Sequence, residues 1–71
     1  MKLPDVDKVA AKVHESWMQS KRNLGVLSRK SEKGEELMVP YEKLTNESQE
    51  LDRASVRAVY SAIESLSKEG E

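Results

Sequence analysis

The 71-residue sequence contains no cysteine, no phenylalanine and a single histidine, His14. Without cysteine, the chain has no disulfide to stabilise a small fold and no thiolate to bind a metal or attack a substrate. A lone histidine also provides too few ligands for a structural zinc ion. We therefore expect a fold held by packing alone, with no bound metal and no cofactor.

Long apolar runs and targeting signals are missing as well. No segment approaches the roughly 20 apolar residues that a membrane span requires. Asp5 and Asp7 stand where the apolar core of a signal peptide would have to begin. We therefore expect a cytoplasmic protein without a membrane partner, and the absence of cysteine is consistent with that reducing compartment.

The sequence also lacks the motifs of common enzyme classes. It has no Gly-x-x-x-x-Gly-Lys-Ser/Thr phosphate loop, no Gly-x-Ser-x-Gly nucleophile turn and no calcium loop of alternating acidic ligands. His14 is the only imidazole that could act as a general base. We therefore expect a protein that is not an enzyme.

Charge is abundant but nearly balanced, with 35% charged residues and a net charge of -1. Residues 1–34 carry eight basic and four acidic side chains, whereas residues 35–71 carry four basic and nine acidic ones. The opposite net charges of the halves favour attraction within one chain or between two chains. Because a duplex-binding surface is usually basic, nucleic acid is disfavoured as a partner, and a small helical DNA-binding protein is only a weak alternative.

Apolar periodicity predicts two long helices. The first runs from about Asp5 to Asn23 and ends before Gly25; the second runs from about Asn46 or Ser48 to Lys68, and Gly70 closes it. The apolar stripe of the first helix contains Val6, Val9, Ala10, Val13, Trp17 and Met18. That of the second contains Leu51, Ala58, Val59, Ala62, Ile63 and Leu66, widened by Val56 and Tyr60.

The segment between these helices, residues 24–45, has no helical period. A polar loop over residues 28–36 separates two short apolar pieces, residues 24–27 and 37–39, which can form two short strands. Two helices cannot enclose a core, so we expect this crossover to cover them with Leu37, Met38, Val39, Tyr41 and Leu44. The predicted fold class is mostly α with minor β, as a single domain over residues 1–71.

Four short motifs follow one another along the chain. They are His14-x-x-Trp17, Lys21-x-x-x-Gly25, Val39-Pro40-Tyr41-x-x-Leu44 and Asp52-Arg53. Their order and spacing, over about residues 9–63, resemble the RyR domain, the ryanodine receptor repeat. In ryanodine receptors these repeats occur in tandem pairs as cytosolic regulatory domains, and a free-standing domain of this size is similar to small bacterial and phage members. The resemblance implies no enzymatic activity.

The chain departs from the family pattern at the glycine turn. Family members usually continue as Gly-Trp-x-Tyr-Gly, whereas this chain has neither aromatic residue in Gly25-Val26-Leu27-Ser28. If those aromatic residues stack on a ligand in other members, this chain lacks that platform. If they only pack, Val26 and Leu27 can replace them.

The motif residues are the candidates for ligand binding: His14, Trp17, Lys21, Arg22, Tyr41, Asp52 and Arg53. His14 and Trp17 are neighbours on one helix face, where they form either a corner for a planar ligand or structural contacts. We favour the structural interpretation, with Trp17 as the main core anchor and His14 bonded to the 39–41 segment.

Tyr41 and Arg53 also have two interpretations. The Tyr41 hydroxyl faces a ligand or, as we favour, bonds to Asp52 or His14. Arg53 lies near the start of the second helix, where the helix dipole favours Asp52 but opposes a cation, so it needs an anionic ligand or an acidic partner such as Glu15 or Glu42. The basic residues Lys21, Arg22, Arg29, Lys30 and Lys33 form either a site for phosphate or an acidic surface, or an ordinary solvated region.

The resemblance implies association with nucleotides or protein partners, and together with the clustered aromatic and basic motif residues it predicts a non-catalytic binding or regulatory module that takes a nucleotide-like anion or a protein partner. Its expected site is a shallow groove lined by Trp17, Lys21, Arg22, Tyr41 and Arg53. The alternative is an assembly protein that forms a homodimer, because a thin core and oppositely charged halves both favour self-association.

Overall fold

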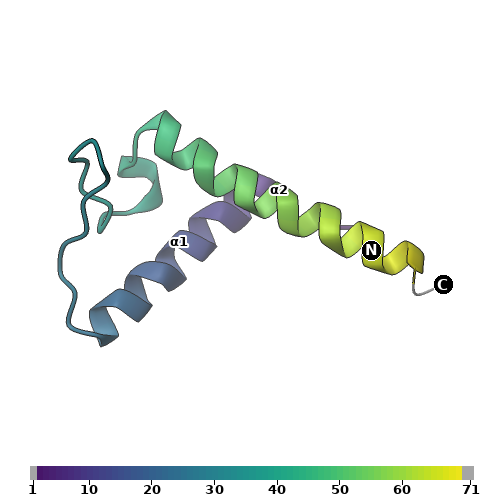
Figure 1. The fold of residues 1–71 in the computed structure, drawn as a ribbon, viewed down its shortest axis with the longest axis horizontal. Coiled ribbons are helices and arrows are strands. Elements are labelled where there is room, and N and C mark those ends of the chain that lie inside the picture. Colours follow the sequence, from purple (N-terminus) through teal and green to yellow (C-terminus); the bar gives the residue numbers. More distant parts are fainter. Residues whose placement is uncertain (1, 70–71) are drawn as a thin grey trace.

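The computed structural model describes residues 2–69 and contains two long helices joined by a crossover. Helix α1 spans Val6–Asn23, a short 3-10 helix η1 spans Tyr41–Lys43, and α2 spans Asn46–Glu69. Figure 1 shows the helices crossing near the middle of α2 and diverging from there, with the crossover spanning the open side. The mostly helical prediction is confirmed.

The sequence signals at the ends of α1 act as expected, with a shift of one residue. Asp5 is the N-cap rather than a helical residue, and its carboxylate accepts a hydrogen bond from the Lys8 N–H at 3.2 Å. At the other end Gly25 adopts φ 83°, and its N–H donates to the Arg22 carbonyl at 2.9 Å. The Val26 N–H donates to the Lys21 carbonyl, also at 2.9 Å, which completes a Schellman motif.

The start of α2 is capped by two residues that are far apart in sequence. The Thr45 hydroxyl accepts a hydrogen bond from the Ser48 N–H at 3.2 Å, as an N-cap does. The Glu35 carboxylate accepts from the Thr45 N–H at 2.9 Å, a contact that a glutamate inside the helix makes in a local capping box. Gly70, the predicted end of this helix, lies outside the described residues.

The two short strands expected in the crossover are not present among residues 2–69. Only an isolated antiparallel bridge between Lys30 and Glu36 forms there. The physical reason is that the Glu36 carboxylate accepts hydrogen bonds from the Arg29 and Met38 N–H groups, at 2.8 and 3.0 Å. A side chain thus takes donors that a strand ladder would otherwise use.

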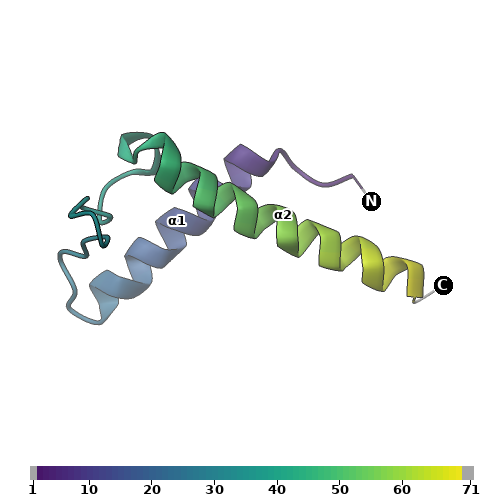
Figure 2. The ribbon, with the colours of Figure 1, turned by 45° about the horizontal axis from the view of Figure 1, so that its top comes forward.

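The core is thin and centres on the crossing of the helices with η1. Its buried apolar residues are Ala10, Tyr41, Leu44 and Val56, with Met18 buried nearby. Leu37 and Val39 pack against this cluster, so four of the five predicted crossover residues cover the helices; Met38 is not among them. Beyond the crossing, the chain that precedes α1 lies beside α2 in Figures 1 and 2, where the Tyr60 hydroxyl donates to the Pro4 carbonyl at 2.9 Å.

Candidate functional site

An open groove lies between α1 and α2, on one side of the helix crossing. Its cavity has a volume of about 430 Å³. Its sides are formed mainly by Val9, Val13, Trp17, Leu51, Val56 and Val59. We call this feature the interhelical groove.

Several apolar residues that line the interhelical groove are exposed to solvent. Val13 is 54% exposed, Leu51 is 68% exposed and Val59 is 57% exposed, although all three belong to the apolar stripes of their helices. The helices and the crossover bury other residues of these stripes, such as Ala10, Met18 and Val56, but leave these three facing solvent. The groove is therefore an apolar surface without a covering layer.

His14 and Asp52 provide the polar floor of the groove. The buried His14 ring places Nε2 at 2.7 Å from the Val39 carbonyl oxygen, so Nε2 carries the proton and donates. Nδ1 lies 3.9 Å from the Asp52 carboxylate, and burial raises the pKa of that carboxyl while the nearby His14 opposes the rise. The predicted bond between His14 and the 39–41 segment is confirmed.

Trp17 borders the groove rather than anchoring the core. Its ring stacks on His14 with the centroids 5.5 Å apart and the planes 23° apart. The side chain is only partly buried and stands outside the central cluster. Our interpretation of Trp17 as the main core anchor was therefore wrong, because the diverging helices leave its position at the open side of the groove.

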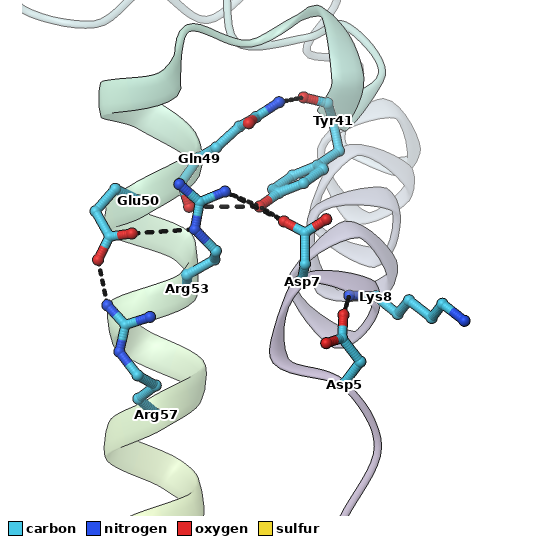
Figure 3. A network of polar contacts seen from close by, with 8 residues as sticks. All are labelled: Asp5, Asp7, Lys8, Tyr41, Gln49, Glu50, Arg53 and Arg57. Atoms are coloured by element: carbon cyan, nitrogen blue, oxygen red, sulfur yellow. Dashed lines mark hydrogen bonds and ion pairs between the residues drawn. The ribbon is translucent and has the colours of Figure 1, made fainter.

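A second group of predicted residues lies away from the groove, in a polar network between α1, η1 and α2. The Tyr41 hydroxyl donates to Asp7 at 2.9 Å, and Arg53 Nη1 lies 3.2 Å from both the Asp7 carboxylate and the Tyr41 hydroxyl oxygen. Arg53 Nε donates to Glu50 at 3.0 Å. Figure 3 shows these side chains converging, with Glu50 also bonded to Arg57.

The partners that we predicted for Tyr41 and Arg53 were wrong. Tyr41 bonds to Asp7 instead of Asp52 or His14, and Arg53 pairs with Asp7 and Glu50 instead of Glu15 or Glu42. The reason is that η1 directs the tyrosine toward the first turn of α1. The expectation that Arg53 needs an acidic partner near the helix start is confirmed.

The network shifts the pKa values of its members. Hydrogen bonds from Tyr41 and then Arg53 lower the pKa of Asp7, and bonds from Arg53 and Arg57 lower the pKa of Glu50. Burial, followed by the bond to Asp7, raises the pKa of Tyr41, while the Glu50 bond is the main cause that raises the pKa of Arg53. Because Nε and Nη1 of Arg53 are already engaged, this arginine is a structural ion-pair partner in the network.

The remaining predicted residues, Lys21 and Arg22, lie in the last turn of α1. Their carbonyls accept the bonds of the Schellman motif, and the Arg22 side chain is exposed. Within the described residues, no lysine or arginine lines the interhelical groove. The structure thus places His14, Trp17 and Asp52 at the groove, Tyr41 and Arg53 in the network, and Lys21 and Arg22 at the end of α1. Arg22 and Tyr41 also line one open hollow beside α1, together with Lys8 and Lys12.

Our prediction of the site did not include Val13, Leu51 or Val59, which form the exposed walls. The signal was present in the sequence, since each apolar stripe is longer than two crossing helices can bury. At the glycine turn, Val26 is partly buried but Leu27 is 82% exposed, so only Val26 packs against the rest of the fold.

Other classes of site have little support in the part of the chain that the structure describes. Residues 2–69 contain no group of three or more histidine, cysteine, aspartate or glutamate side chains that could hold a metal ion. Neither helix, over the same residues, has the length and apolarity needed to cross a bilayer. The interhelical groove is therefore the feature on which a functional proposal can rest.

Comparison with curated proteins and with solved structures finds no significant match. The family model described as the RyR domain matches residues 3–68, which is nearly the whole chain. The motifs that carried the resemblance lie within this range. The chain belongs to the RyR domain family.

Proposed function

We propose that this RyR domain is a non-catalytic binding module whose interhelical groove receives apolar side chains of a protein partner. The observation that carries the proposal is the exposure of Val13, Leu51 and Val59 along one groove. Exposed apolar surface is costly in water unless a partner covers it. A groove between helices is also a common receptor for the apolar face of a partner helix.

The same geometry favours a protein partner over a nucleotide-like anion. A phosphate site needs free cationic donors, but no basic side chain among the described residues lines the groove, and Arg53 is paired with Asp7 and Glu50. Arg22 and Tyr41 do line one open hollow beside α1, but Glu15 and Glu42 line it as well and Arg53 does not. If binding of the partner at the groove depends on the state of the cell, the module has a regulatory role.

Selection of peptides from a random helical library tests this proposal. Selected peptides are expected to carry apolar anchors spaced three or four residues apart, and to lose binding to the Leu51→Glu variant. Leu27→Glu is the matched control, because Leu27 is even more exposed but lies in the crossover away from the groove. Binders that tolerate Leu51→Glu would contradict the groove assignment.

A titration with adenine and guanine nucleotides tests the other interpretation. We expect no change in the amide NMR resonances of the groove residues or of Arg22, Tyr41 and Arg53. A saturable nucleotide-induced shift at these three residues would establish an anion site and overturn the preference for a protein partner.

A further inference from the structure

The chain exposes more surface than a protein of its mass usually does. Its solvent-accessible surface is 5560 Å². A compact monomer of 8.0 kDa is expected to expose about 4,500 Å², so the excess is about 1,000 Å². Because one partner in a stable interface of standard size loses about 800 Å², the excess is as large as one side of such an interface.

The dimensions of the chain agree with its large surface. The radius of gyration is 14.4 Å, whereas a compact domain of this length is expected to have about 11 Å. Figures 1 and 2 show the cause: the second half of α2 projects past α1 and has only the chain that precedes α1 beside it.

This projecting half of α2 carries its own apolar stripe, most of which is uncovered. Val59, Ile63 and Leu66 recur at helical spacing; Val59 and Leu66 are exposed, the latter at 66%, whereas Ile63 is half-buried. A single molecule therefore presents two unsatisfied apolar surfaces, the interhelical groove and the projecting stripe. Val59 belongs to both, so the two surfaces are continuous.

We propose that the partner received by the groove is a second copy of this chain, bound about a two-fold axis. The projecting stripe of each copy fills the interhelical groove of the other. This inference rests on the proposed function and names the partner. Two-fold symmetry makes the contact reciprocal, so both copies cover both of their apolar surfaces in one closed dimer.

Sedimentation of the whole chain from micromolar to millimolar concentration tests the proposal. We expect a concentration-dependent dimer, accompanied by a change in the fluorescence of Trp17, the only tryptophan. Leu51→Glu in the groove and Leu66→Glu in the stripe are each expected to raise the dissociation constant at least about tenfold, because each buries a charge at an apolar contact. Leu27→Glu is expected to leave it unchanged.

Mixing the two variants provides the sharpest test. A pair formed by one Leu51→Glu chain and one Leu66→Glu chain contains one contact with only native side chains, whereas each variant alone damages both contacts. The mixture is therefore expected to associate more tightly than either variant. Helical circular dichroism of the dilute variants checks that both still fold, as expected for residues that are exposed in the monomer.

Three results would overturn the proposal. They are a strict monomer up to millimolar concentration, a dimer that tolerates both substitutions, and the absence of rescue in the mixture. If the chain is monomeric but selected peptides still bind in a manner sensitive to Leu51→Glu, the groove is an interaction site for a different protein. In that case the proposed function stands and the second copy is excluded as the partner.

Discussion

Arg53 and Asp7 form an ion pair across the helix crossing, with 3.2 Å between Nη1 and the carboxylate oxygen. The Tyr41 hydroxyl contacts both residues, so the pair joins the first turn of α1, the crossover and α2. The side chain of Arg53 is largely covered by these contacts. Tyr41 of Val-Pro-Tyr and Arg53 of Asp-Arg, one residue from each of two family motifs, therefore meet at a structural connection rather than at the interhelical groove.

Replacing Tyr41 with phenylalanine is expected to lower stability without affecting the groove. The change removes the hydroxyl that donates to Asp7 and accepts from Arg53, in a largely buried position. We expect the free energy of unfolding to fall by about 1–2 kcal/mol, which lowers the melting temperature by about 4–8 °C for each kcal/mol. Thermal denaturation followed by circular dichroism measures this, and an unchanged melting temperature would contradict the structural role.

Glu35→Gln is expected to loosen the start of α2. The pKa of Glu35 is lowered chiefly by the Ser48 hydroxyl and by the Thr45 N–H, so the charged carboxylate is the form that these donors stabilise. Hydrogen exchange of the amides over residues 45–49 should accelerate in the variant. The exposed Glu32 offers a control, because Glu32→Gln leaves the cap in place; equal exchange rates in both variants would rule out the cap.

Substitutions of two leucines distinguish the contribution of a buried side chain to stability from that of an exposed one. Leu44→Ala removes a buried side chain and is expected to cost about 2–5 kcal/mol, because the cavity cannot fully collapse. Leu27→Ala changes a side chain that faces solvent and should alter stability by no more than about 0.5 kcal/mol. Urea unfolding of both variants provides the comparison. Similar losses would mean that Leu27 is covered in solution.

Acid is expected to weaken the crossover through Glu36. Hydrogen bonds from the Ser28 hydroxyl, the Arg29 N–H and the Met38 N–H lower the pKa of this carboxyl from 4.5 to about 2. Since the folded pKa lies below the unfolded value, the stabilisation is complete above about pH 4.5 and is lost as the pH falls through about 2. Asp52, with a raised pKa, contributes in the opposite direction.

The measurement is the free energy of unfolding from urea titrations across this acidic range. Glu36→Gln should be less stable than the native chain near neutral pH and should lose less stability on acidification. A variant with the same pH profile as the native chain would show that Glu36 does not order the crossover.

The helices were predictable because their signals are local. Asp5, Gly25 and the 3.6-residue apolar period act within one or two turns, so the bounds of both helices came out within about one or two residues. The crossover was not predictable in the same way. Its strands are replaced by contacts of Glu35 and Glu36 to backbone groups up to ten residues away, and no periodic pattern encodes such contacts.

The candidate site was predicted only in part, again because sequence patterns encode local contacts and not distant ones. The bond from His14 to the 39–41 segment joins residues 25 apart, and it was expected because the crossover has to return over the helices. Nothing comparable pointed to the network partner Asp7, which lies 46 residues from Arg53. The chain has many carboxylates, and the sequence gives no distances from which the partner of Arg53 could be chosen among them.

The sequence by itself determined the family, the two helices and the need for a covering crossover, since these depend on motif order and apolar periodicity. Only the tertiary structure decided which apolar residues remain uncovered. The stripes of α1 and α2 are longer than their crossing, so diverging helices bury Ala10 and Val56 but leave Val13, Leu51 and Val59 in an open groove. The angle at which two helices separate is set by packing at their crossing, and it decides which part of each stripe remains for a partner.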